Sequence, residues 1–402
     1  MHTRSNSHIF DYLVIGKGLM GAAAARYLSQ VTPNVALVGP DEPADWANHR
    51  GVFASHYDQG RITRRLSEDA VWSALAQRAI GQYAYLEKTS GVLFYWPVGG
   101  LYVAPHGRDA AYLAAVAAVA QRFSLDFSLY ATSLELEQAD GRLQFPPNCH
   151  GLLEPPPAGY INPRGLLQAQ ATIAAQQGVW VVAETVTAVT PHAHAVEILT
   201  ETGRVLWARK ALIAAGAFAN CYDLLPRKLD LRVKSETILL ARLSEAEAAR
   251  LRGLPTVLYQ IDSPDIDSIY LLPPIVYPDG RAYLKIGGNT RTDQWLPNLE
   301  AMRKWMIAGD SAVMEEPIRA ALEEMIPGLQ IEAATTHRCL VAYTAHGKPY
   351  VDQLTDRVYV AAGGNGVSAK SSDTLGWLAA NLMQTGGWPL AFERALFEAR
   401  FV

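Results

Sequence analysis

Three things are scarce in this 402-residue sequence: cysteine, charge and long apolar runs. Its three cysteines, Cys149, Cys221 and Cys339, lie far apart without the spacing of a metal site. This argues against a disulfide framework or a metal centre and favours a reduced setting. No apolar run approaches the roughly 20 residues that span a bilayer, and the polar stretch 1–8 lacks the apolar core of a signal peptide. We therefore expect a cytoplasmic protein without a membrane partner.

Charged residues make up only 18% of the chain, and the formal net charge is −4. This balance argues against a nucleic-acid or anionic-membrane surface. Half of the residues are hydrophobic, which is enough for sizeable cores, and the length suggests two domains. The composition thus predicts a globular chain without a nucleic-acid partner.

The segment around Gly16, Gly18 and Gly21 has the pattern G-x-G-x-x-G. An apolar run, Tyr12 to Ile15, predicts a buried strand before it, and an alanine-rich stretch predicts a helix after it. In this context Gly16 allows the tight turn, Gly18 the approach of a pyrophosphate, and Gly21 the close packing of helix on strand. The free amides of the helix N-terminus would hold the negative charge. A chance glycine turn is the alternative, but the flanking strand and helix favour dinucleotide binding.

The second half of this fingerprint is incomplete. The next strand, 34–38, should be followed by an acidic residue that binds a ribose hydroxyl. It ends instead in Gly39, and Asp41 and Glu42 come slightly late. Either acid, or a backbone group, could take that role. The motif alone leaves NAD and FAD both open.

Later segments predict further helices and a second glycine turn. Ser67, followed by two acids, predicts the N-cap of a helix that runs to Gly91. A last apolar strand, 357–362, precedes a glycine-rich turn, 363–366, and another helix. Because this last strand and turn are similar to the first pair, we predict one discontinuous nucleotide-binding domain with a second domain inserted into it.

Five motifs in order resemble the FAD-dependent D-amino-acid-oxidase-like superfamily, and within it the monomeric sarcosine oxidase branch, over nearly the whole chain. They are Asp11–Gly16, Arg61-Ile-Thr-Arg64, Leu284-Lys285-Ile286-Gly287, the segment Thr336–Thr344 around Cys339, and Gly366-Val-Ser-Ala-Lys370. The resemblance implies an α/β fold (α+β overall), with a discontinuous Rossmann-type FAD-binding domain and an inserted antiparallel-sheet substrate domain. We expect the FAD-binding domain at 1–92, 150–222 and 335–402, and the substrate domain at 93–149 and 223–334.

Lys285 has an ordinary alternative role. In a strand it would point away from its apolar neighbours Leu284 and Ile286, and alone it would be interpreted as a solvated lysine. The resemblance implies instead that it lies over the flavin and promotes the reaction with oxygen. The physical reason is that a fixed cation stabilises negative charge as it develops.

Cys339 alone would be interpreted as a small buried hydrophobic residue. The resemblance implies that it forms a covalent bond to the 8α carbon of the flavin. The neighbours His337 and Arg338 could favour the thiolate that such a bond needs.

Arg61, Arg64 and Lys370 form the predicted substrate end of the site. Alone, the arginines would be a solvated basic loop. The resemblance implies that Arg64 and Lys370 hold the substrate carboxylate, which suits the planar fork of a guanidinium. It places Arg61 beside the flavin and Lys370 between carboxylate and flavin. Tyr270 would line the substrate pocket, with an ordinary core or surface aromatic as the alternative.

The resemblance also implies backbone contacts to the cofactor. The amides of Gly364, Asn365 and Gly366 would face the pyrimidine end of the flavin. Val186 and Gly216 would contact the adenine and pyrophosphate parts of FAD.

Three departures from the family pattern surround the expected pocket. Asn289 stands where sarcosine oxidases have a histidine, Gly366-Val-Ser-Ala-Lys370 stands where they have G-H-G-F-K, and His56-Tyr57 replaces a pair of histidines. Sarcosine itself is therefore not the substrate we expect.

We expect an FAD-dependent oxidase of a small amino acid with a secondary or N-substituted amine. Hydride transfer to the flavin would give an imine, and molecular oxygen would be reduced to hydrogen peroxide. No dedicated general base stands out, so positioning would carry much of the catalysis. A flavin-dependent dehydrogenase with another electron acceptor is the nearest alternative. A nicotinamide-dependent reductase, or a dinucleotide-binding module without turnover, would leave Cys339 and Lys285 without a role.

Overall fold

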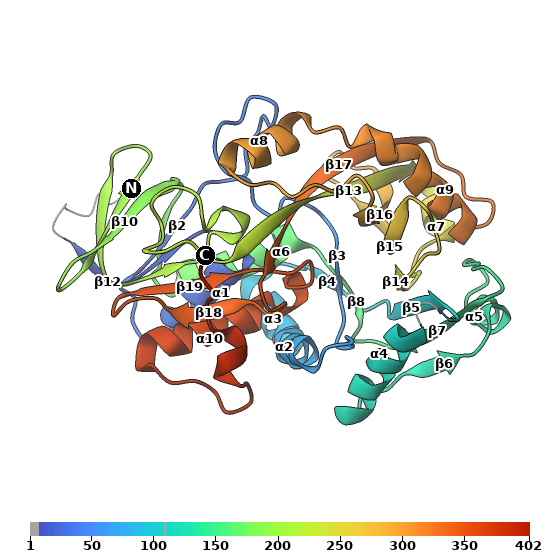
Figure 1. Ribbon diagram of the computed structural model, residues 1–402, viewed down its shortest axis with the longest axis horizontal. Coiled ribbons are helices and arrows are strands. Elements are labelled where there is room, and N and C mark those ends of the chain that lie inside the picture. Colours follow the sequence, from blue (N-terminus) through green and yellow to red (C-terminus); the bar gives the residue numbers. More distant parts are fainter. Residues whose placement is uncertain (1–7, 108–109) are drawn as a thin grey trace.

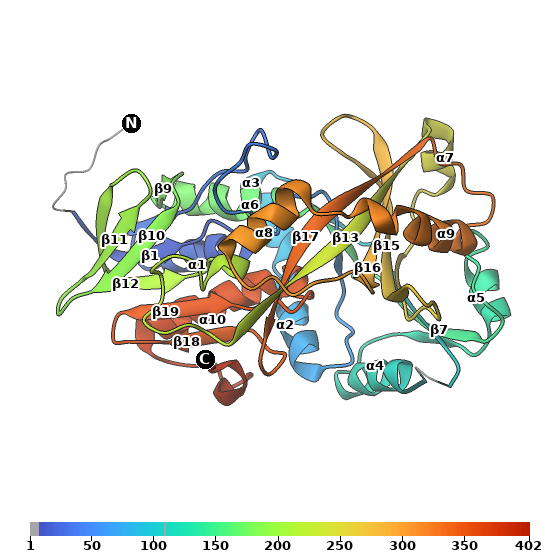
Figure 2. The same cartoon turned by 45° about the horizontal axis from the view of Figure 1, so that its top comes forward.

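The computed structural model describes residues 8–107 and 110–402. Figure 1 shows two lobes side by side, each built on a large sheet. The long strands β13 (Leu231–Leu243) and β17 (Ala333–Thr344) extend from the second lobe toward the first, as the turned view in Figure 2 also shows. These strands bring the second sheet close to the glycine turns of the first.

The first lobe contains a largely parallel sheet. Its parallel strands follow the order β9 (Trp180–Val182), β2 (Val35–Val38), β1 (Ile9–Ile15), β12 (Val205–Ile213) and β19 (Val358–Ala362). The antiparallel strands at its edges are β18 (Tyr350–Gln353) beside β19, and β11 (Val196–Thr200) and β10 (Val186–Pro191) beside β12. Strands β2 and β19 are buried along their whole length, as expected of parallel strands covered on both faces. The predicted first and last strands therefore belong to one sheet.

The second lobe contains a largely antiparallel sheet. Its order is β17, β13, β16 (Ala282–Thr290), β15 (Ile266–Val276), β14 (Thr256–Tyr259), β5 (Gly100–Pro105), β7 (Cys149–Glu154) and β6 (Ser128–Tyr130). Only β14 and β5 pair in parallel among the strands of this sheet in the described residues. A small third sheet, β3 (Arg61–Thr63), β8 (Gly159–Ile161) and β4 (Tyr95–Trp96), carries the arginine motif.

Helices cover both large sheets (Figure 1). They are α1 (Leu19–Leu28), α2 (Ala70–Ile80), α3 (Tyr83–Ser90), α4 (Ala110–Arg122), α5 (Ser133–Ala139), α6 (Pro163–Gln176), α7 (Glu245–Arg250), α8 (Leu299–Ala308), α9 (Glu315–Met325) and α10 (Ser372–Thr385). The apolar face of α9, with Ile318, Leu322 and Met325, packs into the core of the second sheet. That burial accounts for a helix whose other face is acidic.

A buried polar network fixes α1, α6 and α10 relative to one another. Arg26 of α1 donates to Asp373 of α10 at 2.8 Å, and Gln170 of α6 donates to the same carboxylate at 2.8 Å. Arg26 is 1% exposed, and a charge so buried is tolerated only when it is paired. The helix that holds the first glycine turn is thereby locked to the helix that follows the last one.

The helix predicted from Ser67 to Gly91 is wrong in two respects. Its cap is Asp69, whose carboxylate accepts from the amides of Val71 at 2.9 Å and Trp72 at 3.2 Å. The segment is also two helices, α2 and α3, separated at Gly81, where glycine is a poor helix former. The predicted end at Gly91 is confirmed, because this residue adopts φ 74°.

Two strands belong to a different sheet from the one that the expected domain limits suggest. Strand β7 pairs with β5 and β6, and β17 pairs with β13 from Leu231–Thr344 to Arg242–Ala333. Both lie in the antiparallel sheet, although the limits at 150 and 335 assign most of their residues to the FAD-binding domain. The division into domains stays a prediction. Within the described ranges, no helix is both long and apolar enough to cross a bilayer.

Candidate active site

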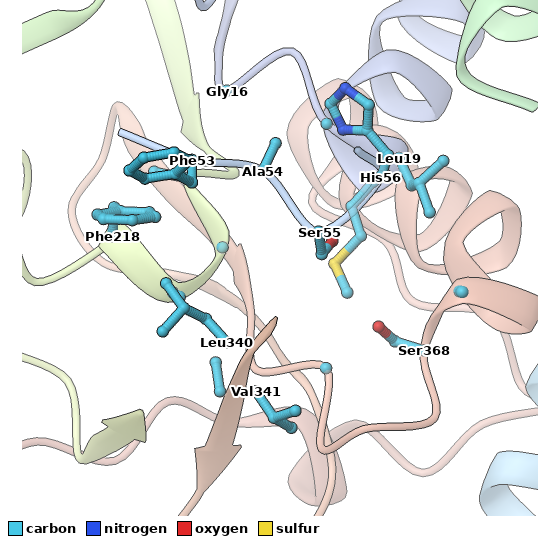
Figure 3. Close-up of a pocket in the computed structure, with 18 of the residues that line it drawn as sticks. Gly16, Leu19, Phe53, Ala54, Ser55, His56, Phe218, Leu340, Val341 and Ser368 are labelled. Carbon is cyan, nitrogen blue, oxygen red and sulfur yellow. The ribbon is translucent and has the colours of Figure 1, made fainter. Parts of the chain in front are cut away.

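A long pocket lies between the two lobes. Figure 3 shows Phe53 and Phe218 next to each other on one side, Ser368 on another, and Leu340 and Val341 of β17 between them. The predicted site residues that line this pocket are Gly16, Gly18, Arg61, Arg64, Val186, Gly216, Tyr270, Cys339, Gly364, Gly366 and Lys370. Those that do not line it in the described structure are Gly21, Asp41, Glu42, Lys285 and Asn365. Sequence reasoning thus brings together most of one site.

The first glycine turn has the geometry that its pattern predicts. Gly16 adopts φ 109°, and a Cβ there would lie 2.3 Å from the Ala214 oxygen. A Cβ on Gly21 would lie 1.9 Å from the Gly16 oxygen, so this residue serves packing. Gly18 faces open space, and no described side chain caps the helix that begins after it. The free amides at the N-terminus of α1 would therefore suit an anionic group bound in the pocket.

The acids expected at the ribose are engaged elsewhere. Asp41 pairs with Lys17, and both oxygens of Glu42 accept from Arg164, at 2.6 and 2.7 Å. A Cβ on Gly39 would lie 2.5 Å from the backbone nitrogen of Lys17. A side chain at the end of β2 would therefore collide with the first glycine turn, which explains why no acid stands there.

The last glycine turn closes over the end of β17. Asn365 adopts φ 49°; its side chain accepts from the Thr344 amide at 3.0 Å and donates to the Gly363 oxygen at 3.0 Å. Its side chain therefore holds the turn together rather than facing the pocket. Gly364 and Gly366 line the pocket on either side of it.

Lys370 and Arg64 of the pocket have no ion pair with an acidic residue in the described part of the chain. Lys370 is 2% exposed, and its Nζ has no hydrogen-bond partner there. Burial holds the pKa of Lys370 well below its usual value, and the charge of Arg64 lowers it further. Arg64 itself donates to the Leu66 oxygen, and its guanidinium lies 5.4 Å from the ring centre of Tyr102. Since an unpaired buried cation is costly, this arrangement is suited to an anionic ligand.

Lys285 belongs to a buried ion-pair network behind the pocket wall. It is 0% exposed, and its Nζ donates to Asp58 Oδ2 at 2.5 Å and to the Gly60 oxygen at 2.8 Å. Asp58 also pairs with Arg61 and accepts from the Tyr277 hydroxyl at 2.8 Å. Burial would raise the pKa of Asp58, but the charges of Lys285 and Arg61 hold it well below its usual range. One carboxylate thus serves two cations.

The surroundings of Cys339 differ from those expected. Burial raises the pKa of its thiol to about 11, and the cations that oppose this are Arg61 and Lys285. Arg338 instead donates to the Gly309 oxygen at 2.6 Å, because alternate residues of a strand point to opposite faces. Burial lowers the pKa of His337. The expectation that His337 and Arg338 favour the thiolate is therefore not supported.

Two residues of the site, Asp58 and Glu236, were missed by the sequence reasoning. Asp58 is the partner of both Lys285 and Arg61. Glu236 of β13 lines the pocket next to Cys339, with which it is paired in register across β13 and β17. His56 also lines it, and burial lowers its pKa to about 3, with Arg164 the next cause. The only signals for the two acids were a carboxylate three residues before Arg61 and an acid in an otherwise apolar strand.

The chain is similar to known proteins over nearly its whole length. A family model described as FAD dependent oxidoreductase matches residues 11–382. Monomeric sarcosine oxidase from Bacillus sp. (strain NS-129) is 24% identical over 387 residues, with 94% of this chain and 93% of that protein covered. The enzyme of the same name from Arthrobacter sp. (strain TE1826) is 26% identical over 384 residues, with the same coverage.

Solved structures show the same fold. NikD, described as an unusual amino acid oxidase essential for nikkomycin biosynthesis, superposes with a TM-score of 0.79 at 18% identity, and 98% of each chain is covered. Glycine oxidase from Geobacillus kaustophilus gives a TM-score of 0.74 at 19% identity, again with 98% of each chain covered.

Proposed function

Because the chain belongs to the FAD-dependent oxidoreductase family, whose model matches residues 11–382, we propose that it oxidises a small amino acid with a secondary or N-substituted amine. The products are an imine and, from molecular oxygen, hydrogen peroxide. The observation that carries the proposal is the buried amino group of Lys370, which lacks a hydrogen-bond partner among the described residues and lies close to Arg64. A substrate carboxylate supplies the missing charge.

The residues present fit FAD. The open space at Gly18 and the uncapped start of α1 suit the pyrophosphate, and Val186 and Gly216 suit the adenine side. The amides of Gly364 and Gly366 suit the pyrimidine end of the flavin, whereas the Asn365 amide already donates to the Ala342 oxygen at 2.8 Å. When bound, FAD accepts a hydride and passes electrons to oxygen. The protein's own task is then to hold the substrate by its carboxylate, to exclude water and to place the amine.

We further propose that Cys339 attaches the flavin covalently. Cys339 lines the pocket, and Arg61 and Lys285 lower the pKa that burial raises; both cations favour a thiolate. The first measurement is the visible spectrum of purified protein before and after acid precipitation. Yellow colour should stay in the pellet, and it should move to the supernatant in Cys339→Ala but not in Cys221→Ala, a buried control. Colour released from the unaltered protein contradicts the bond.

Substrate range tests the function itself. N-methyl amino acids, cyclic imino acids, glycine and D-amino acids are scored by peroxide formed. Asn289, which is hydrogen-bonded to Lys234 at 2.5 Å and to Ser268 at 3.1 Å, stands where sarcosine oxidases have a histidine. Sarcosine should therefore not be the best substrate. Turnover of an uncharged amine, with no carboxylated amine turned over, refutes the role of Arg64 and Lys370.

A dehydrogenase with another electron acceptor is distinguished from an oxidase by its peroxide yield under air. Lys285→Met should abolish oxygen reactivity in the oxidase and leave reduction by substrate in place. The cytoplasm remains the expected compartment, which the three free cysteines support.

A further inference from the structure

Glu236 is a pocket carboxylate for which the reaction outlined above has no use. It lies on β13, is the cross-strand neighbour of Cys339 on β17, and lines the pocket. The Tyr270 hydroxyl donates to its Oε1 at 3.4 Å. Burial raises the pKa of Glu236, against the charge of Lys234. A carboxylate in such a place must have a partner or remain costly.

The neighbouring sheet is shaped to bring Tyr270 to this carboxylate. Tyr270 of β15 is in register with Gly287 of β16. A Cβ on Gly287 would lie 2.6 Å from the Tyr270 hydroxyl oxygen, so any larger residue there would displace the ring. Burial, and next the charge of Glu236, raise the pKa of Tyr270 well above its usual value. Tyr270 therefore stays protonated and donates.

The cations around Glu236 already have other partners. Lys285 and Arg61 share Asp58, and Lys234 pairs with Asp293 at 2.7 Å. No ion pair of Glu236 itself occurs among the residues that the structure describes. The pocket thus presents cations without an ion pair, Arg64 and Lys370 among them, and one carboxylate without an ion pair, Glu236.

We propose that Glu236 binds the cationic nitrogen of the substrate and accepts its proton before hydride transfer, so that the pocket selects amino acids that arrive as zwitterions. This inference rests on the proposed function, because it presumes that the carboxylate of the same substrate meets Arg64 and Lys370. A zwitterion neutralises both unpaired ends of the pocket, whereas a simple carboxylate leaves Glu236 unpaired. Glu236 is then the residue that distinguishes an amino acid from an acid of the same shape.

Ligand pairs that differ only in the nitrogen test this assignment. Proline is compared with cyclopentanecarboxylate, and N-methylglycine with butanoate, by the change that each causes in the oxidised flavin absorbance of the holoenzyme, recorded anaerobically in a stopped-flow instrument before any reduction. The variants are Glu236→Gln, which keeps the shape, and Glu236→Asp, which keeps the charge. Glu332→Gln is the control, because Glu332 pairs with Arg242 at 3.2 Å, is not a pocket residue and is 46% exposed at its side chain.

The unaltered enzyme should bind the nitrogen-containing member of a pair at least about 10-fold more tightly, the size of one charge-assisted hydrogen bond. Glu236→Gln should lose that preference through weaker binding of the amino acid alone; Glu236→Asp should keep part of it, and Glu332→Gln all of it. Equal weakening of both members, or a preference that survives in Glu236→Gln, refutes the assignment. Failure of the proposed function looks different: the nitrogen preference is present, but no amine yields peroxide.

Discussion

Replacing Asp58 with asparagine tests whether one carboxylate holds two buried cations. Asp58 Oδ2 lies 2.5 Å from Lys285 Nζ and also pairs with Arg61. In Asp58→Asn the amide oxygen still accepts one hydrogen bond, but the negative charge is gone. Removing one partner of a buried ion pair costs about 3–5 kcal/mol. Because one acceptor remains, we expect the free energy of unfolding to fall by about 3 kcal/mol.

The pH dependence of this loss has a definite sign. The pKa of Asp58 is depressed in the folded protein, so its contribution is fully present above the unfolded value of about 3.9 and is lost as the pH falls toward the folded value. The difference between the unaltered protein and Asp58→Asn, measured by denaturant unfolding, should be constant between about pH 5 and 8. It should shrink below about pH 4. A difference that instead grows toward acid pH refutes the pairing.

The same variant should slow the reaction with oxygen. Burial, and next the charge of Arg61, lower the pKa of Lys285, and Asp58 opposes them. Without Asp58 that pKa falls further, and less of the cation proposed to promote the oxygen reaction remains. The assay mixes substrate-reduced enzyme with aerated buffer in a stopped-flow instrument. Tyr277→Phe, which removes a neutral donor to Asp58, is the control and should keep most of the rate. If Asp58→Asn and Lys285→Met are additive in stability to within about 0.5 kcal/mol, the two residues are not coupled and the reasoning fails.

Other positions give sharper contrasts. Lys370→Met should raise the KM for carboxylated substrates at least about 10-fold, because a charge-assisted contact is lost. It should also stabilise the substrate-free protein in denaturant unfolding, because a buried cation without a partner among the described residues is removed. A stabilised variant with unchanged KM refutes the anion site. Gly18→Ala should fold but incorporate less FAD, since its Cβ points into the open space that the pyrophosphate would take. Gly21→Ala should fail to fold, since its Cβ would lie 1.9 Å from the Gly16 oxygen. Equal flavin content in soluble preparations of both glycine variants contradicts this distinction. Asp373→Asn should lower the free energy of unfolding by about 3 kcal/mol, because Arg26 loses its charged partner; a chemical denaturation curve that overlays the unaltered protein's contradicts this.

The parts of the site that sequence reasoning finds are those whose meaning is local. The first glycine turn follows from a strand, three glycines and a helix within 20 residues, although Gly16 itself lies against the distant Ala214. Asp58 and Glu236 have no such local signal. Their roles depend on which strands become neighbours, since Asp58 meets Lys285 across 227 residues and Glu236 meets Cys339 through the register of β13 and β17.

The acids after Gly39 show the opposite failure. Asp41 and Glu42 stand close to where the fingerprint wants an acid, yet Lys17 and Arg164 neutralise them. Sequence spacing predicts that a residue lies near a site, but only the folded structure shows which basic residue pairs with it. The same holds for Cys339: its sequence neighbour Arg338 donates to the Gly309 oxygen, while Arg61, distant in sequence, lowers the pKa of its thiol.

The partners of Arg61, Arg64 and Lys370 in the pocket, and of Lys285 behind its wall, separate the roles of these cations. Lys285 and Arg61 share Asp58, so they are held in place whether or not a ligand is bound, as a fixed electrostatic contribution to catalysis requires. Lys370, by contrast, has no hydrogen-bond partner among the described groups, and Arg64 donates to a backbone oxygen and lies beside Tyr102 without an ion pair there. An anionic ligand would give both a charged partner. The paired cations therefore suit the permanent chemistry of the site, and the unpaired cations suit the substrate that comes and goes.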